Sequence, residues 1–315
     1  NIGNTCYLSA MLQIVFCVPD FLTEVNNIYT SDEDYDEEEE ENRDMPLTKA
    51  LLDVATTLGL LGDGDAEVAD PSKLKALFDA YTQQMIEEGW SPSEFAIGIQ
   101  HDPHEFWVCF FDIWKEEHPQ LESLINDYFL LQVEKRRACD NCGDLSSRTE
   151  EGIHPLSVAI VENAEDEQQS IQDLVDNHFQ NEGNVVFHHD DEDDDGCGEH
   201  TTATLSKKIK KCPKALLVHI KRFDAENQKN DARIHLTETL SLPHHEEDND
   251  NCNYRLCGVL NHIGGSVNNG HCTAITKKGD QWIHYDDAIG TRRSISFFTG
   301  NEHKQRQCYI ALYIQ

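Results

Sequence analysis

Residues 1–13 read Asn-Ile-Gly-Asn-Thr-Cys-Tyr-Leu-Ser-Ala-Met-Leu-Gln and place one cysteine, Cys6, at the start of an expected helix. Up to residue 18 this helix carries apolar residues at helical spacing, namely Leu8, Met11, Leu12, Val15 and Phe16. The unpaired N–H groups and the dipole of a helix N-terminus favour an anion, so the thiol of Cys6 should ionise readily. Gly3 lets the backbone approach closely before the helix, where N–H groups could stabilise an oxyanion. Cys6 is therefore a candidate nucleophile, although a lone cysteine in an apolar helix is more often a core residue.

A candidate base lies near the other end of the chain. The loop 268–270 contains a glycine and ends at His271, the first residue of an expected strand, while Asp286 and Asp287 end the next expected strand. A turn at residues 277–281 would make these strands an antiparallel pair and bring His271 beside Asp286. A carboxylate in that place fixes the imidazole tautomer and stabilises its protonated form. The pair supplies what a cysteine nucleophile needs.

The hydrophobic pattern changes from helical to strand-like at about residue 128. Helical spacing predicts four helices before that point, at residues 6–18, 47–58, 71–88 and 104–114. After it, short alternating segments predict strands at residues 129–136, 215–223, 254–262, 271–276, 282–286 and 307–313, with one further helix at 170–179. No βαβ repetition is present. The order of elements therefore predicts an α+β fold with mostly antiparallel pairing.

The net charge of −34 excludes nucleic acid as the main partner, because phosphate contacts require basic residues. Three runs concentrate the acidic residues, with 9 in residues 32–41, 6 in 190–195 and 4 in 246–250. We expect them to be solvated loop insertions, near residues 31–44, 188–196 and 244–252. Without those 19 residues the chain still carries −15, which favours encounter with a basic protein surface.

The chain contains no apolar run near the roughly 20 residues that a membrane helix needs, so we expect no membrane partner. It opens at Asn1, inside a motif, and we expect it to be a fragment of a longer protein. The 11 cysteines are scattered rather than regularly spaced, and most lie in apolar stretches. This pattern is typical of buried thiols in an intracellular protein of the cytoplasm or nucleus.

Five segments of the chain resemble, in family order, the sequence blocks of the ubiquitin-specific proteases, which are papain-like deubiquitinases. Residues 1–13 resemble the cysteine box, and Gly-His at 270–271 with Trp282 and Tyr-Asp-Asp at 285–287 resembles the histidine box. The other three blocks are Gln-His-Asp-Pro-His-Glu-Phe at 100–106, Leu-Leu-Val-His-Ile-Lys-Arg-Phe at 216–223 and Cys-Tyr-Ile-Ala-Leu-Tyr at 308–313. Five blocks in order leave little room for chance.

The resemblance implies one papain-like catalytic domain over residues 1–315. A helical thumb would extend to about residue 127, β fingers would lie within 128–213, and an antiparallel β palm would occupy 214–315. The implied activity is that of a thiol protease that hydrolyses the isopeptide or peptide bond after the C-terminal glycine of ubiquitin. Its partners would then be ubiquitin and ubiquitinated proteins, and no catalytic cofactor is implied.

The resemblance also assigns roles to individual residues. Cys6 would attack the carbonyl, His271 would act as base and then as acid, and Asp286 would orient His271. Asn1 falls where the family has its oxyanion-hole asparagine, and Asp287 falls where a supporting polar residue sits.

Two acidic residues match positions that hold the basic C-terminal tail of ubiquitin in the family. These are Asp102 and Glu105, which agrees with the charge argument made above. The plain alternative is that both belong to a helix start, where acidic residues are favoured.

A Cys-x-x-Cys motif at Cys139 and Cys142 predicts a metal knuckle. A redox role is less well supported, because no helix follows the motif. The family often has a second such motif about fifty residues later, and Cys197 and His200 occupy that place here. These four residues would form a Cys₃His structural zinc site, with the histidines at residues 188–189 as competing ligands.

One departure from the family pattern lies beside the base, where Cys272 replaces a tyrosine. It could be a packed thiol or an oxidation-sensitive one. Three other interpretations of the chain stay open: a ubiquitin-binding module without turnover, a protease for a related modifier, and an unrelated structural zinc protein.

Overall fold

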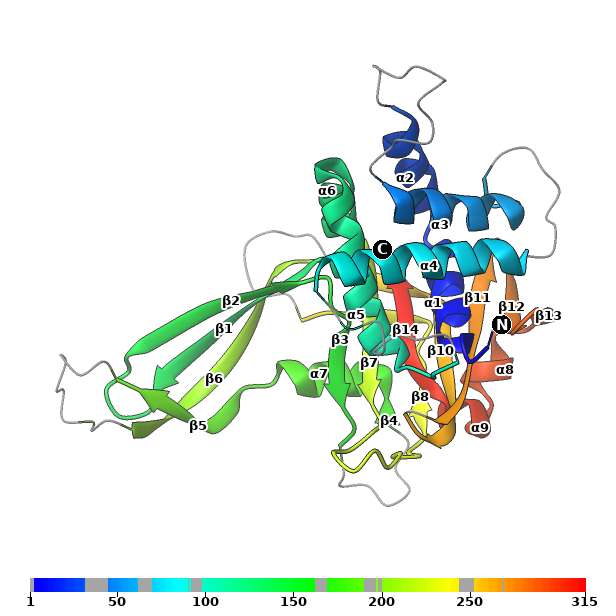
Figure 1. The fold of residues 1–315 in the computed structure, drawn as a ribbon. Helices are drawn as coiled ribbons and strands as arrows, with labels where there is room; N and C mark the ends of the chain where they lie inside the picture. Colours follow the sequence, from blue (N-terminus) through cyan, green and yellow to red (C-terminus); the bar gives the residue numbers. More distant parts are fainter. Residues whose placement is uncertain are drawn as a thin grey trace.

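The computed structural model describes residues 3–31, 45–61, 70–89, 91, 98–161, 169–189, 197, 200–243, 252–267 and 269–315. Figure 1 shows three parts: a helical lobe, a main sheet beneath it, and a second sheet that extends away from both. The structure therefore has the α+β class expected from the sequence. The three acidic runs lie outside the described residues.

The helical lobe contains α1 (Cys6–Phe16), α2 (Phe21–Thr30), α3 (Pro46–Thr57), α4 (Pro71–Glu87), α5 (Pro103–Trp114), the short 3₁₀ helix η2 (Lys115–Glu117) and α6 (Pro119–Phe129). Four of these helices begin with proline, which suits the first helical position because no N–H is needed there. The centre of the lobe is α5, whose buried aromatic side chains pack against one another: Phe106, Trp107, Phe110, Phe111 and Trp114. These rings belong to a hydrophobic core that the lobe shares with one face of the main sheet.

The main sheet has the strand order β13-β12-β11-β10-β14-β7-β3, with β9 paired to β10. Its strands are β3 (Leu156–Ala159), β7 (Ala215–Lys221), β9 (Thr239–Ser241), β10 (Asn253–Ser266), β11 (Asn269–Lys278), β12 (Gln281–Asp286), β13 (Ile289–Arg293) and β14 (Cys308–Ile314). All pairs are antiparallel except β3 with β7. The helices α7 (Ile171–Phe179), α8 (Ser296–Thr299) and α9 (Glu302–Gln305) accompany this sheet.

The second sheet has the order β2-β1-β6-β5 and projects to the left in Figure 1. Its strands are β1 (Leu131–Cys139), β2 (Leu145–Gly152), β5 (Glu182–His188) and β6 (His200–Lys211). A separate parallel pair joins β4 (Gln169–Ser170) to β8 (Ile234–His235). Nearly every residue of β2 is exposed, so this sheet contributes little to the core.

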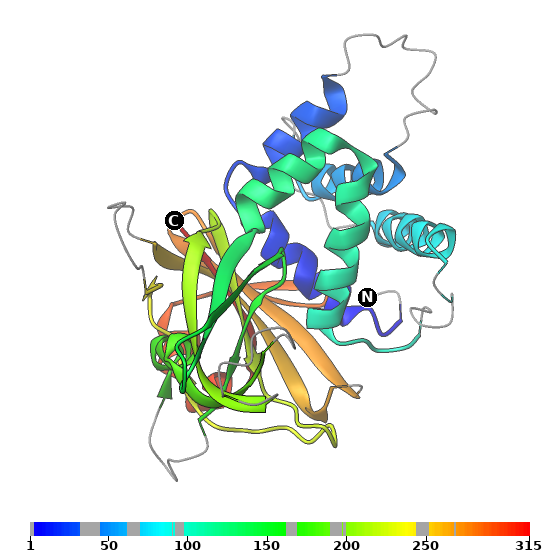
Figure 2. The ribbon, with the colours of Figure 1, turned by 90° about the vertical axis from the view of Figure 1, so that its left-hand side faces the viewer.

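The lobe meets the main sheet through α1, which packs against β10 and β11. Figure 2 shows the helices gathered on one side of that sheet. At the contact, Gly258 of β10 faces Ile14 of α1 and Cys17, which directly follows that helix, and a side chain at Gly258 would approach the end of the Ile14 side chain too closely. Glycine thus allows this close approach without displacing the Ile14 side chain.

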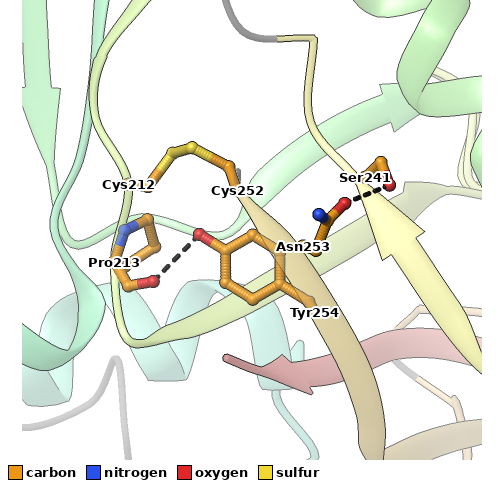
Figure 3. The surroundings of a disulfide bond; sticks show 6 residues. All are labelled: Cys212, Pro213, Ser241, Cys252, Asn253 and Tyr254. Carbon is orange, nitrogen blue, oxygen red and sulfur yellow. Dashed lines mark hydrogen bonds between the residues drawn. A yellow bond between two sulfur atoms is a disulfide. The ribbon is translucent and has the colours of Figure 1, made fainter. Parts of the chain in front are cut away.

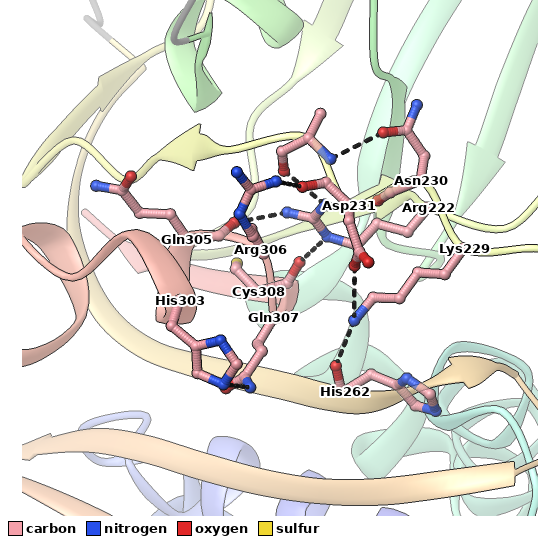
Figure 4. Close-up of polar contacts among 11 residues, drawn as sticks. Arg222, Lys229, Asn230, Asp231, His262, His303, Gln305, Arg306, Gln307 and Cys308 are labelled. Carbon is pink, nitrogen blue, oxygen red and sulfur yellow. Dashed lines mark hydrogen bonds and ion pairs between the residues drawn. The ribbon is translucent and has the colours of Figure 1, made fainter. Parts of the chain in front are cut away.

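Arg222, directly after β7, is a buried cation that ties several chain segments together (Figure 4). Its Nε donates to the Cys308 carbonyl at 2.6 Å, and one Nη donates to the carbonyls of Asn230 at 3.0 Å and Ala232 at 2.9 Å. The other Nη donates to the Gln305 carbonyl at 2.8 Å. Burial lowers the pKa of Arg222 to about 10, so the side chain stays charged at neutral pH.

Two of the eleven cysteines differ from the expectation of free thiols. Cys212 follows β6 and forms a disulfide with Cys252, which precedes β10 (Figure 3). Nearby, the Tyr254 hydroxyl donates to the Pro213 carbonyl at 2.9 Å. The other nine cysteines are free thiols.

Among the described helices, none is by itself long and apolar enough to span a membrane. The consecutive helices α1 and α2 together meet the length and composition required, but they are bent by 91°.

We predict that Arg222→Met destabilises the fold strongly, because four carbonyl oxygens lose their donor while most of the bulk remains. The free energy of unfolding should fall by at least about 3 kcal/mol, measured by urea denaturation. Arg292→Met is the matched control, because Arg292 is exposed on β13. Equal midpoints for the two variants would contradict this account of Arg222.

Candidate active site

Cys6 is the first residue of α1, and its side chain is only 4% exposed. The backbone N–H of Cys272, on β11, donates to Cys6 Sγ at 3.4 Å. A thiolate at this position would therefore be stabilised by a donor from the sheet as well as by the helix N-terminus. The helix start was expected from the sequence, whereas this donor depends on how the lobe packs on the sheet.

His271 and Asp286 lie side by side, as the predicted hairpin requires. β11 and β12 are antiparallel neighbours joined through Gly279, whose φ of 58° closes the turn. His271 Nε2 is 2.7 Å from Asp286 Oδ1. If Asp286 accepts a hydrogen bond from Nε2–H, the other ring nitrogen, Nδ1, is the one that can exchange a proton with Cys6.

Relative to the ordinary values of their side chains, the pKa of Cys6 is lowered and the pKa of His271 is raised. The pKa of Cys6 is lowered to about 6, and the largest cause is a hydrogen bond from the Cys272 thiol. Burial acts to raise this pKa, whereas the Cys272 N–H and His271 lower it further. Burial acts to lower the pKa of His271, but hydrogen bonds to Asp286 and Cys6 outweigh it and raise that pKa. The two shifts favour a thiolate–imidazolium pair near neutral pH.

Two contacts hold the lobe against the sheet beside this pair. Gly270 N–H donates to Gln100 Oε1 at 2.9 Å. The Tyr309 hydroxyl, on β14, lies 2.8 and 3.0 Å from the two carboxylate oxygens of Asp102. Asp102 also caps α5 by accepting from the His104 N–H at 2.8 Å. Burial raises the pKa of Asp102 to about 6.

The structure places the remaining predicted site residues unequally. Glu105 is exposed in the first turn of α5, whereas Asp102 already has partners inside the protein. Asp287 is exposed, with a φ of 50°, and lines a small cavity beside Cys6. Asn1 lies outside the described residues, so its predicted role stays a prediction.

A cluster of three cysteines and one histidine lies in the second sheet and could bind a metal ion. The ligand atoms of Cys139, Cys142, His189 and Cys197 all lie within 4.8 Å of one another. Three thiols and one imidazole are a donor set that suits tetrahedral zinc. His189 Nδ1 lies 3.3 Å from Asp144 Oδ2, so its Nε2 faces the thiols, as metal-binding histidines with a carboxylate partner do.

The histidine that the described residues place in this cluster is His189, and the predicted role of His200 stays a prediction. His200 begins β6 and pairs with His188, but its side chain lies outside the described part of the chain. The predicted Cys139, Cys142 and Cys197 are brought together. The sequence did mark residues 188–189 as competing ligands, but spacing alone could not choose among the histidines.

Cys272 is the site residue whose role sequence reasoning missed. Its thiol is 2% exposed, and both its thiol and its N–H act on Cys6. The signal available in the sequence was its unusual identity beside His271. Its role depends on the packing of α1 on β11, which the sequence alone does not reveal.

We predict that Cys272→Ala raises the pKa of Cys6 from about 6 toward the ordinary range of a thiol, because the thiol donor is lost. The pH dependence of Cys6 alkylation by iodoacetamide, followed by mass spectrometry of the peptide that contains Cys6, measures this. Cys308→Ala, at a buried cysteine of β14, is the control. An unchanged alkylation midpoint in Cys272→Ala would contradict the proposed donor.

Comparisons with known proteins give the chain a family. The family described as "Ubiquitin carboxyl-terminal hydrolase" matches residues 1–313. Probable ubiquitin carboxyl-terminal hydrolase 16 of Schizosaccharomyces pombe is 24% identical over 328 residues, covering 99% of this chain and 65% of the relative. Ubiquitin carboxyl-terminal hydrolase 25 of Arabidopsis thaliana is 23% identical over 335 residues, covering 99% and 46%. The chain thus spans less than two thirds of the length of these two relatives.

One further relative and one solved structure also match the chain. Ubl carboxyl-terminal hydrolase 18 of Mus musculus is 22% identical over 303 residues, covering 91% of this chain and 76% of the relative. A chain in the structure of the SAGA Ubp8/Sgf11/Sus1/Sgf73 DUB module bound to ubiquitin aldehyde superposes with a TM-score of 0.77 and 20% identity, covering 100% of this chain and 68% of that chain. The fold and the family match agree with the five sequence blocks, and the chain belongs to the ubiquitin carboxyl-terminal hydrolase family.

Proposed function

We propose that this chain is a cysteine-type deubiquitinase that hydrolyses the peptide or isopeptide bond after the C-terminal glycine of ubiquitin. The observation that carries the proposal is the site itself: Cys6, from the first helix, interacts with His271, which is hydrogen-bonded to Asp286 near the far end of the chain. Family membership supplies the class of substrate. Ubiquitin and ubiquitinated proteins are then its partners.

In the proposed mechanism Cys6 acts as a thiolate. Its sulfur attacks the carbonyl carbon, and His271 passes its proton to the leaving amine as the C–N bond breaks. A thioester remains on Cys6, and His271 then removes a proton from the water that hydrolyses it. Asp286, bonded to Nε2, keeps the ring oriented and stabilises the imidazolium in both steps.

Four residues support this reaction in the proposal. Asn1 contributes to the oxyanion hole, and Asp287 supports the base. Glu105 and Asp102 attract the basic tail of ubiquitin, with the exposed Glu105 as the direct contact and the half-buried Asp102 as the residue that holds the start of α5 against Tyr309.

A second candidate function is hydrolysis of a ubiquitin-like modifier, which the likeness to mouse Ubl carboxyl-terminal hydrolase 18 favours. The same chemistry would serve, because the two modifiers differ outside the scissile bond. Comparing kcat/KM for fluorophores attached to ubiquitin and to its relatives decides between them, and a higher value for a relative would displace ubiquitin.

We also propose that Cys139, Cys142, Cys197 and His189 hold a structural zinc ion. The support is the Cys₃His donor set and the carboxylate of Asp144 on His189. When bound, zinc would join the end of β1 to the end of β5. Because the second sheet has few buried side chains, such a link would contribute directly to its stability.

We further propose an intracellular location, in the cytoplasm or nucleus, on the basis of the nine free thiols. The disulfide between Cys212 and Cys252 is the observation that weighs against it. Microscopy of the tagged protein tests this proposal, and finding the protein secreted from the cell would overturn it.

We predict that Cys6→Ala abolishes release of a fluorophore from the C-terminus of ubiquitin, lowering kcat by at least about a thousandfold. Ubiquitin binding, measured by calorimetry, should persist, because only the nucleophile is removed. Cys109→Ala, at a half-buried cysteine of α5, is the control.

In the same assay, Glu105→Gln should raise KM more than Asp102→Asn, because Asn can still accept the hydrogen bonds of His104 and Tyr309. No turnover by the folded, ubiquitin-binding wild-type chain would instead favour a binding module. Loss of binding in Cys6→Ala would indicate a fold defect.

We predict one equivalent of zinc in the purified protein, and a lower melting temperature after chelation. His189→Ala should release the metal, whereas His200→Ala should retain it. Metal analysis together with thermal unfolding measures both effects. Less than about half an equivalent in the wild-type protein would remove the zinc proposal, and loss of metal only in His200→Ala would restore the ligand set predicted from the sequence.

A further inference from the structure

Two hollows adjoin along the partly buried face of α1. The smaller lies beside the nucleophile and is lined by Cys6, Gln13 and Tyr285 among others. The larger, of about 490 Å³, lies at the C-terminal end of α1 and is also lined by Gln13 and Tyr285. Because they share these two side chains, the larger hollow adjoins the small one beside Cys6.

The sequence of α1 explains why both hollows lie along this helix. Most of the helix is buried, but Ser9, Gln13, Phe16 and Cys17 are only partly buried. These residues recur every three or four positions and therefore share one face of the helix. We call the larger hollow the helix-end groove; its lining includes Gln13, Phe16, Cys17, Lys277, Lys278 and Tyr285.

The groove leads away from the residues proposed to hold the ubiquitin tail. Residues 100–102 lie near the N-terminal end of α1, where the rings of His101 and Tyr7 are 5.5 Å apart. The groove lies at the opposite end of that helix. A scissile bond at Cys6 has two sides, and the tail occupies the first. The groove is therefore placed to receive what is attached on the second side.

The charge of the groove is unusual for this acidic chain. Lys277 and Lys278, at the end of β11, are exposed on one rim and have no acidic partner among the described residues. Asp20 lies on the other rim. Lys277 lies at the edge of the groove and also lines a neighbouring hollow with Glu238 and Asp280.

We propose that the helix-end groove binds the polypeptide released from ubiquitin, and that Lys277 and Lys278 select acidic side chains near the modified lysine. This inference rests on the proposed deubiquitinase function and adds a class of substrate to it. The groove is reached from Cys6 along 11 residues of helix, or about 16 Å at 1.5 Å per residue. An extended chain covers that distance in about five residues, which sets how near the acidic residues must lie.

The test uses ubiquitin joined by an isopeptide bond to the lysine of short peptides with acidic, neutral or basic flanking residues. Ubiquitin carrying only a C-terminal fluorophore is the reference, because it places no peptide in the groove. We expect wild-type kcat/KM to be about tenfold higher for the acidic than for the basic peptide, and the preference to weaken with salt.

Lys277→Glu with Lys278→Glu should lower kcat/KM for the acidic conjugate, relative to the fluorophore reference, by about tenfold. Lys49→Glu with Lys75→Glu changes the net charge equally, on α3 and α4, and is the control. A second variant, Thr23→Trp, fills the groove from α2 and should lower this ratio for all three peptides.

Equal rates for the acidic and basic peptides in the wild-type protein would overturn the groove assignment while leaving the deubiquitinase function intact. So would equal ratios in the two charge-reversal variants. Failure to cleave the fluorophore reference as well as every peptide conjugate would overturn the proposed function, and the groove assignment with it.

Discussion

The contact of α1 with β10 and β11 is the constraint on which the site depends. It joins the first described helix to strands that lie some 250 residues later in the chain, and at Gly258 a side chain would crowd Ile14 and Cys17. The same contact places the Cys272 N–H against Cys6 Sγ. One packing interface therefore sets both the position of the nucleophile and the ease with which it ionises.

Much of the fold was predictable because its central elements have strong periodicity. α1, α3, α4, α5 and α7 fall within a few residues of their predicted positions, as do the strands β7, β10, β11, β12 and β14. The sequence analysis missed β2, whose exposed side chains leave no alternating pattern to detect. It also missed the helices α2 and α6 and the strands β5 and β6 of the second sheet.

The candidate site divides in the same way. Cys6, His271 and Asp286 were predictable because a helix start and a hairpin position them locally. Cys272 and His189 were not, because their importance arises from contacts between elements distant in sequence. His189 meets Cys139 and Cys142 only when β5 and β1 both pair with β6. Asp102 was predicted only in part. Its place at the start of a helix was named as an alternative role, but its hydrogen bond with Tyr309 was not predicted.

The separation of Cys6 from His271 has a consequence for the order in which the molecule is made. A ribosome adds about 5–20 residues per second, so the 265 residues between them take roughly 15–50 s to synthesise. Throughout that interval the nascent chain carries its thiol without the strand that activates it. The pKa of Cys6 should then be that of an ordinary cysteine, because Cys272 and His271 do not yet exist. Translation itself thus delays the reactive thiolate until nearly all of the domain has emerged.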